Sequence, residues 1–506
     1  MSTLPPGIRH IVVLMLENRS FDHLLGNLPG VDGPTSRSNI DPKDGSVVPV
    51  TFDADYFSPA LPDPKGTGEM LGDPHHDVIA VNRQLFETDA PSPGATPTCG
   101  GFILAGRESG DADAELIARE VMRSFDAPAK LETLTSLANA FVVCDRWFAS
   151  VPGPTWPNRL FAHAATSSGH VDNNFRPYDM PTIYDTLDEV KVDWAIYYHD
   201  VPQSLCIHEL LDRTDSSGRQ CMRSIDDFYR DAKKHTAQVP TLAPYTFIEP
   251  GYFEPPQTWY GRLLDFLKWV AHSCGAPVKP SKGHPNDMHA PHDVRLGEHL
   301  VADVYEALRS NDEVWNHSLL IVLTDEHGGL YDHVAPGAAA NPDGKVSTSP
   351  PFGFDRLGLR VPAILVSPFL KPDVHVDSTP YEHASIIATV QQTFAPAAKP
   401  LNARAAAAAP LRADLFAPSP RAGDDKRLPR PAPVFWIPRH GDPESRPLND
   451  LHESLVDLAA SAGAMPPGAP ASAAPADEQT RPRSEGAAHS WVRARVRARL
   501  GGKRAG

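Results

Sequence analysis

Two apolar segments, far apart in the chain, each end in a pair of adjacent oxygen-bearing side chains. The segments span residues 11–16 and 318–324, and neither alternates with polar residues. Short, wholly apolar runs of this kind are typical of buried parallel strands. The side chains that follow are Glu17 and Asn18 after the first run, and Asp325 and Glu326 after the second. Because ligands of open α/β folds lie outside the carboxyl ends of strands, we expect all four at one edge of a sheet.

Such an all-oxygen set has the chemistry of a divalent-metal site. Mg²⁺, Ca²⁺ and Mn²⁺ prefer these ligands, and carboxylate-rich hydrolase sites also take Zn²⁺. The alternative is that the first pair caps a helix and the second lies in a solvated turn. That explanation would suffice for either pair alone, whereas two pairs after two buried strands favour the metal site.

The order of predicted elements indicates the fold class. Further strands are expected within residues 141–145, 193–200, 241–253 and 359–369. Helices are expected at 114–125, 131–139, from 158 onward, and at 182–189, 206–229, 296–310 and 383–394. Alternating strands and helices predict an α/β sandwich with a mostly parallel central sheet and long loop insertions.

Composition divides the chain into a catalytic domain and a tail. Proline is abundant, 53 of 506 residues, and alanine and proline dominate the later part of the chain. We predict a domain at 1–410, a proline-rich extension with a short helix at 411–462, and a disordered tail at 463–506. Arginines alternate near the end, which is not a helical amphipathic pattern, so a solvated basic tail is favoured over a partner-binding arm. These arginines are Arg493, Arg495, Arg497 and Arg499.

Charge and cysteine usage exclude several classes of protein. The net charge of −16 argues against a nucleic-acid binder. The five cysteines form no CxxC pair, so a disulfide framework or a zinc-thiolate site is not expected. No signal peptide and no apolar run of bilayer length are visible, so a cytoplasmic protein without a transmembrane segment is expected. A true start upstream would make it secreted or periplasmic.

Thr155 and four histidines are the remaining candidates. Thr155 precedes Trp156 and Pro157, which makes it a candidate helix N-cap with its hydroxyl near a helix dipole. The histidines lie in dense polar segments, where ordinary loop hydrogen bonding explains each of them as well as catalysis does. They are His76, His199, His289 and His333.

Four sequence blocks resemble the signature blocks of the phosphoesterase family, in the family's order. They are ENRSFDH at 17–23, TWPNR at 155–159, DEHGGLYDHV at 325–334 and GLRVPAILVSP at 358–368. The family contains bacterial phospholipases C, plant non-specific phospholipases C and related bacterial acid phosphatases. The resemblance covers roughly residues 8 to 400 and implies an alkaline-phosphatase-like three-layer α/β/α sandwich.

The resemblance also implies roles for particular residues. The four oxygen-bearing residues would bind the metal, Thr155 would be the nucleophile, and His76 and His289 would contact the phosphoryl group. Weaker candidates for substrate binding are Asn158, Arg159, His199 and His333. The family usually has NDDHP where this chain has Met288 before the histidine, so an acidic neighbour of His289 is lost.

The expected activity is metal-dependent phosphoester hydrolysis. We favour a phospholipase C that cleaves glycerophospholipid to diacylglycerol and a phosphorylated head group, through peripheral contact with a membrane surface. Aromatic residues that could face lipid are Trp156, Phe161 and residues 194–198, although a core position explains them equally well. One alternative is an acid phosphatase that acts on small phosphoesters at the same site. An alternative of another class is a non-catalytic metal-binding scaffold or membrane-surface binder.

Overall fold

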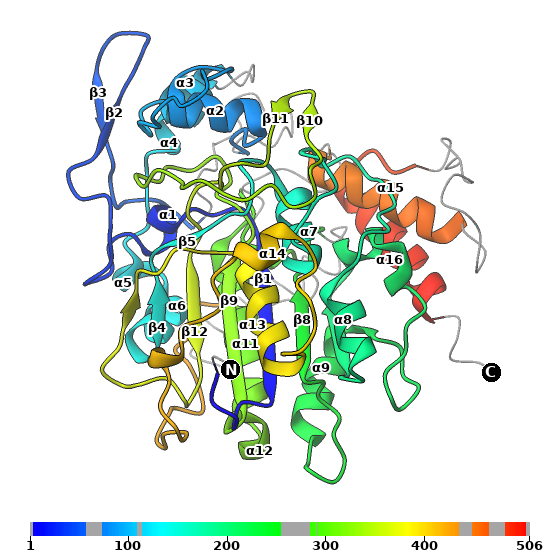
Figure 1. Ribbon diagram of the computed structural model, residues 1–506. Helices are drawn as coiled ribbons and strands as arrows, with labels where there is room; N and C mark the ends of the chain where they lie inside the picture. The colour runs from blue at the N-terminus through cyan, green and yellow to red at the C-terminus, as the bar shows by residue number, and fades with distance from the viewer. Residues whose placement is uncertain are drawn as a thin grey trace, which may run out of the picture.

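An eight-stranded sheet forms the centre of the molecule (Figure 1). The computed structural model describes residues 4–56, 73–108, 114–254, 284–290, 292–434, 448–464 and 481–501. The strands, in their order across the sheet, are β13 (Val376–Asp377), β4 (Val142–Cys144), β12 (Ala363–Val366), β9 (Ser318–Thr324), β1 (His10–Leu16), β8 (Tyr245–Glu249), β6 (Trp194–Tyr198) and β7 (Met222–Ser224).

The sheet is mostly parallel, as predicted. Only β12 runs antiparallel, to both β4 and β9, and every other neighbouring pair is parallel. All residues of β1 and β9 are buried, which explains why both strands consist of apolar runs. These two strands are direct neighbours, and Leu16 at the end of β1 pairs with Thr324 at the end of β9.

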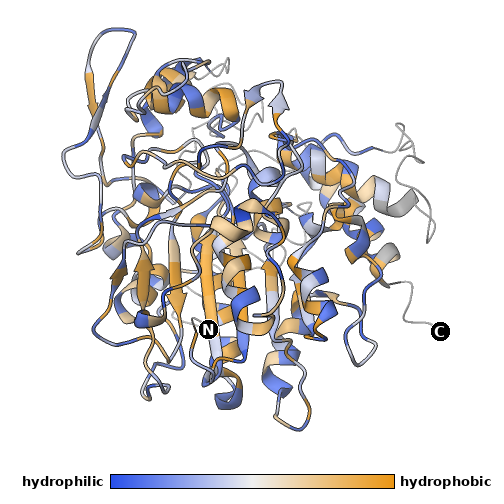
Figure 2. Cartoon of the chain, in the orientation of Figure 1, coloured by the Kyte–Doolittle hydropathy of each residue, from blue (hydrophilic) through white to orange (hydrophobic). Residues whose placement is uncertain are grey.

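Helices cover the sheet in two groups. Members of each group contact one another: α7, α8 and α13 in one, and α6, α9 and α11 in the other. The strands are strongly apolar, whereas the helices present both apolar and polar faces (Figure 2), as amphipathic helices of an outer layer do. The chain is therefore a three-layer α/β/α sandwich.

The helices of the structure are α1 (Phe21–Leu25), α2 (Val78–Phe86), α3 (Phe102–Arg107), α4 (Ala114–Glu120), α5 (Ala127–Lys130), α6 (Glu132–Ala140), α7 (Thr155–Ala164), α8 (Ile183–Glu189), α9 (Ile225–Lys234), α11 (Val294–Arg309), α12 (Asp312–Trp315), α13 (Ala384–Phe394), α14 (Ala403–Ala407), α15 (Asp450–Ala464) and α16 (Glu485–Gly501). Three 3₁₀ turns lie at Gln203–Cys206, His208–Leu210 and Ala413–Leu415. Small two-stranded sheets pair β2 (Ser38–Ile40) with β3 (Val47–Pro49), β10 (Ser347–Thr348) with β11 (Pro351–Phe352), and β5 (Trp147–Phe148) with β14 (Tyr381–Glu382). No helix in these described stretches is both long and apolar enough to cross a bilayer.

The prediction of one helix over residues 206–229 is wrong. The segment contains the 3₁₀ turn at His208–Leu210, then strand β7, and α9 begins only at Ile225. Asp215 accepts hydrogen bonds from the backbone of Ser217 and Arg219, which closes a polar turn instead of a helix. Ser224 and Asp227 then form a capping box that fixes where α9 starts.

The C-terminal residues also differ from the prediction. Residues 485–501, expected to be a disordered or solvated tail, form helix α16, which packs against α15 (Figure 1). Ala488, Val492 and Val496 are buried and recur every four residues, so α16 has a narrow apolar stripe between its arginines. The rest of the predicted low-complexity tail, residues 465–480 and 502–506, lies outside the described residues.

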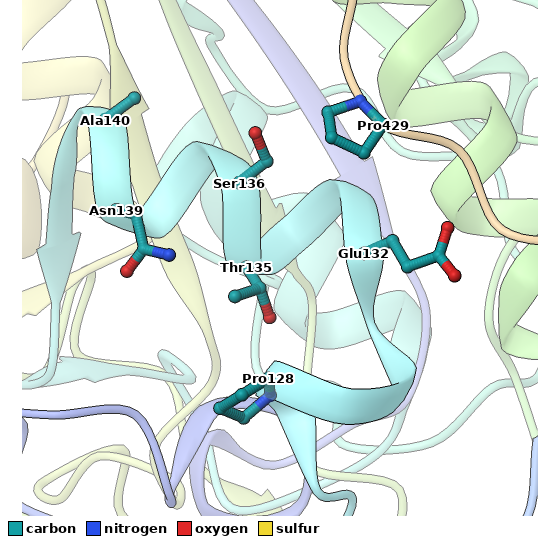
Figure 3. Close-up of a pocket in the computed structure, with 7 residues that line it drawn as sticks. All are labelled: Pro128, Glu132, Thr135, Ser136, Asn139, Ala140 and Pro429. Atoms are coloured by element: carbon teal, nitrogen blue, oxygen red, sulfur yellow. The ribbon is translucent and has the colours of Figure 1, made fainter.

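A shallow surface groove of about 450 Å³ lies beside α6 (Figure 3). Its lining residues come from α5, α6 and the segment around Pro429, and they are Pro128, Glu132, Thr135, Ser136, Asn139, Ala140 and Pro429. None of the residues predicted to carry chemistry lines this groove.

Candidate active site

The register of β1 and β9 brings the two predicted pairs of oxygen ligands together. The Asp325 N–H donates to the Leu16 carbonyl at 3.2 Å, and the Asn18 N–H donates to Asp325 Oδ1 at 3.1 Å. Asn18 adopts a left-handed conformation with φ of 44°, which turns the chain sharply after the strand. Gly328 packs on this turn, and a Cβ there would lie 2.3 Å from the Asn18 carbonyl oxygen, so only glycine fits.

Thr155, at the start of α7, places its hydroxyl beside these oxygen-bearing side chains. Its Oγ1 lies 3.0 Å from Glu17 Oε2 and 3.2 Å from Asn18 Oδ1, and the side chain is fully buried. The predicted N-cap role is wrong, because Thr155 is the first residue of α7 and Pro154 precedes it in an extended conformation.

Asn158 braces the turn before α7. Its side chain accepts a hydrogen bond from the Val151 N–H at 3.0 Å and donates to the carbonyls of Gly153 and Pro154 at 2.9 and 3.1 Å. These contacts engage both ends of its amide. Asn158 therefore positions Thr155, and no contact points it toward the carboxylates.

Few backbone N–H groups at the start of α7 are left for a ligand. The Trp156 N–H donates to Asn173 Oδ1 at 2.9 Å, and Pro157 has no N–H. Asn173 is held in turn by Asp450 of α15, whose Oδ2 accepts from Asn173 Nδ2 at 2.8 Å. The C-terminal helices thus reach α7 through one intermediate side chain.

Arg159 lies between the two carboxylates that follow the strands. Its Nε donates to Glu17 Oε1 at 2.7 Å and to Asp325 Oδ2 at 3.2 Å, and all three side chains are fully buried. Burial raises the pKa of Glu17 well above its usual range even though Arg159 opposes the shift. Burial likewise raises the pKa of Asp325 to about 6.

His76 lies beside Asn18 and Glu326. Its Nδ1 donates to the Pro74 carbonyl at 2.7 Å, so Nε2 faces Asn18 Nδ2 at 3.3 Å and Glu326 Oε1 at 3.7 Å. Burial alone would lower the pKa of His76, but Glu326 and Asp73 outweigh it and raise the pKa to about 10. The sequence offered no reason to single out Asp73 beyond its place in a polar loop.

His289 stands 6.3 Å from His76 between ring centroids. Its Nδ1 donates to the Ala290 carbonyl at 2.5 Å, and its buried Nε2 makes no hydrogen bond. Burial lowers the pKa of His289 well below its usual range, so the ring is neutral. Met288 before it has a positive φ of 76° and packs against Gly297, while its carbonyl accepts from Arg19 Nε at 2.6 Å.

His199 and His333, the two weaker histidine candidates, contact other groups. His199 Nε2 lies 3.2 Å from Asn286 Nδ2. His333 joins Asp22 at 2.7 Å in a network that also contains Arg360. His383, which sequence reasoning missed, donates from Nε2 to the Asp325 carbonyl at 2.5 Å.

Four of the five aromatic residues considered for lipid contact belong to the core, and the fifth, Tyr198, is only partly buried. Trp156, Phe161, Trp194 and Tyr197 are each at most 1% exposed. They cannot form a lipid-facing surface in this conformation.

The residues present fit a divalent cation. Glu326 Oε1 is buried without a hydrogen-bond partner, with the His76 ring 3.7 Å away as a compensating charge, and is free to accept a cation. The other oxygens of the candidate set that are not fixed by Arg159 or the backbone are Glu17 Oε2, Asn18 Oδ1 and Thr155 Oγ1, and the Thr155 oxygen lies within 3.2 Å of the other two. Such an oxygen set suits hard divalent ions, and Arg159 offsets part of its negative charge.

Comparisons with known proteins agree on one family. The model of the Phosphoesterase family matches residues 8–395. Non-specific phospholipase C6 of Arabidopsis thaliana is 35% identical over 477 residues, which cover 90% of this chain and 80% of the relative. Phospholipase C B of Mycobacterium tuberculosis is 27% identical over 423 residues, covering 76% of this chain and 73% of the relative.

Solved structures resemble the chain only distantly. A protein of the alkaline phosphatase superfamily from Vibrio parahaemolyticus is 11% identical to this chain. The match covers 53% of this chain and 61% of that protein, with a TM-score of 0.29. The fold class therefore follows from the order and direction of the strands and from the helices that cover them.

Proposed function

We propose that this chain, which belongs to the Phosphoesterase family and is a hydrolase of phosphoric esters, is a metal-dependent phospholipase C with Thr155 as its nucleophile. The observation that carries the proposal is the position of the Thr155 hydroxyl, 3.0 Å from Glu17 and 3.2 Å from Asn18 where β1 ends. The names of the plant and bacterial relatives support a glycerophospholipid substrate, cleaved to diacylglycerol and a phosphorylated head group.

The residues that would hold a divalent cation are Glu17, Asn18, Asp325 and Glu326. When bound, such an ion supplies Lewis-acid chemistry, which lowers the pKa of a nearby hydroxyl and offsets phosphoryl charge.

In the first step Thr155 Oγ1 attacks phosphorus, and its proton passes to Glu17 Oε2, the carboxylate oxygen 3.0 Å away. The bond between phosphorus and the diacylglycerol oxygen breaks, and that oxygen takes a proton from the charged His76. A threonine hydroxyl is a weak nucleophile, so an acceptor already within hydrogen-bond distance is what this step requires.

In the second step water releases the phosphorylated head group. His289 Nε2 has no hydrogen-bond partner and its ring is neutral, so it can accept the proton of the attacking water. The bond between phosphorus and Thr155 then breaks, and Glu17 returns the proton to the threonine oxygen. The proton on His289 passes to His76, whose ring centroid is 6.3 Å away, which restores both histidines. The opposite pKa shifts of His76 and His289 suit a donor and an acceptor.

Two substrates and two variants of Thr155 test the proposal. Phosphatidylcholine in vesicles and a simple aryl phosphate are assayed with chelator and then with added Mg²⁺, Ca²⁺, Mn²⁺ or Zn²⁺. We expect metal-dependent release of diacylglycerol by the wild type, loss of turnover in Thr155→Ala, and partial retention in Thr155→Ser. Cleavage of the monoester alone would replace the phospholipase with a phosphatase, and near-wild-type activity of Thr155→Ala would remove Thr155 from the mechanism.

A further inference from the structure

A second group of potential metal ligands lies next to the active site, and nothing in the mechanism uses it. His292 precedes α11, His452 lies on α15, and Glu485 is the first residue of α16. All three are buried, and one ligand atom of each lies within 4.8 Å of the other two. Three separate segments of the chain therefore bring two imidazoles and one carboxylate to one point.

His292 is oriented as a metal-binding histidine would be. Its Nδ1 lies 2.8 Å from Asp287 Oδ1, so the ring donates from Nδ1 and its lone pair is on Nε2. This Nε2 is buried without a hydrogen-bond partner and lies 3.8 Å from Glu485 Oε1. A carboxylate on the far nitrogen is the usual support of a histidine ligand.

His452 has the complementary arrangement. Its Nε2 donates to the Tyr252 carbonyl at 2.9 Å, so its lone pair is on Nδ1. The ring stacks on Phe253 with 4.8 Å between centroids, which fixes its plane. Glu485 is anchored as well, because its Oε1 accepts from the Glu254 N–H at 2.8 Å.

We propose that His292, His452 and Glu485 form a second metal site, which binds Zn²⁺ or a similar borderline divalent ion and joins the C-terminal helices to the active-site loop. Two imidazoles and a carboxylate favour zinc over Mg²⁺ or Ca²⁺. Tetrahedral bonds of about 2.0 Å require ligand atoms about 3.3 Å apart. His292 Nε2 and Glu485 Oε1, 3.8 Å apart, would close by about 0.5 Å, and the other pairs, at most 4.8 Å apart, by at most about 1.5 Å.

The other acidic cluster with a histidine does not qualify. Asp22, Asp332 and His333 also lie close together, but Arg360 donates to Asp22 at 2.7 Å and to Asp332 at 2.8 Å. A guanidinium already supplies the positive charge there.

The competing explanation is a proton in place of the metal. Burial alone would lower the pKa of His292, but Asp287 and Glu485 outweigh it and raise the pKa to about 10. A protonated His292 would then offset the negative charge of the Asp287 and Glu485 carboxylates. The two explanations differ in whether the cluster takes up metal.

A metal at the proposed site would connect the C-terminal helices α15 and α16 to the loop of the active site. Asp287, which supports His292, also accepts from the His289 N–H at 3.1 Å, and its carbonyl accepts from the Glu17 N–H at 2.7 Å. A metal at His292 would therefore fix the loop that carries His289, and α15 and α16 would be held against it.

Metal stoichiometry tests the site without reference to activity. The full chain is stripped with chelator and titrated with Zn²⁺, and with Co²⁺ to record the visible spectrum. We expect the wild type to bind one more equivalent than His452→Ala or Glu485→Gln, and both variants to lose the intense Co²⁺ bands of a tetrahedral site. Asp287→Asn should weaken Zn²⁺ binding about 10- to 100-fold.

The matched control is His235→Ala, which removes a buried imidazole near the opposite end of the strands, where His235 contacts His10. It should keep the wild-type stoichiometry. If His452→Ala does not fold, Glu485→Gln, which keeps its carbonyl oxygen for the Glu254 N–H, carries the comparison. Equal Zn²⁺ stoichiometry in wild type, control and Glu485→Gln would overturn the site and leave His292 as a protonated ion pair.

Discussion

Replacement of Arg159 by methionine should destabilise the metal-free protein strongly. Arg159 donates to Glu17 and Asp325 and also to the carbonyls of Met15 and Leu16, at 3.1 and 3.0 Å. The two carboxylates are fully buried, so neither reaches water when the guanidinium is removed. Loss of one partner of a buried ion pair costs about 3–5 kcal/mol. Protonation of Glu17, whose pKa burial already raises, relieves part of that cost, so we expect about 3 kcal/mol.

Urea denaturation followed by circular dichroism, with chelator present, measures this loss. The control is Arg146→Met, which breaks an ion pair with Asp32 whose side chains are 39% and 37% exposed and which should cost about 1 kcal/mol or less. A divalent cation should stabilise Arg159→Met more than the wild type, because it replaces the missing positive charge. If Arg159→Met loses no more free energy of unfolding than Arg146→Met, Arg159 does not compensate the buried carboxylates.

Three further outcomes follow from the structure. Asn173→Ala removes the acceptor of the Trp156 N–H and should lower kcat more than it raises KM, whereas an unchanged kcat would show that the start of α7 needs no such support. Burial raises the pKa of Glu298 from 4.5 to about 8, so the folded state keeps a proton that the unfolded state releases. The free energy of unfolding should therefore fall by about 1.4 kcal/mol for each unit by which the pH rises between these two values. Glu298→Gln should flatten this dependence on pH, measured by urea denaturation at several pH values. Chelator should abolish phosphoester hydrolysis and excess Mg²⁺, Ca²⁺, Mn²⁺ or Zn²⁺ should restore it; full activity after exhaustive chelation would contradict metal dependence.

The sequence predicts the central strands well because strands buried on both faces consist of short runs of apolar residues, which are easily recognised. Strand β9 has the predicted bounds, and β1 begins one residue earlier than the apolar run. The position of Glu17 beside Asp325 follows from two parallel strands that are neighbours with ends in register. Roles for Thr155 and the histidines came from the family resemblance and stay proposals.

Features that depend on tertiary contacts escaped prediction. The sequence offers Arg159 only as a weaker candidate for substrate binding, and it is the packing of α7 across β1 and β9 that places it between carboxylates. The stripe of α16 is narrow, with one buried apolar residue every four positions, and Arg493 and Arg495 stand between Val492 and Val496. His292 and His452 lie 160 positions apart in the sequence and share no motif, so their meeting is visible only in the structure.

The pairing of Leu16 with Thr324 also determines when during biosynthesis the site can exist. The two residues are neighbours in the sheet although more than 300 residues separate them in the chain. Glu17 and Asn18 leave the ribosome long before Asp325 and Glu326, which cannot join them until the roughly 300 residues between the two pairs have been made. Nascent fragments therefore hold an incomplete set of the proposed ligands, and we expect esterase activity only after β9 has inserted beside β1.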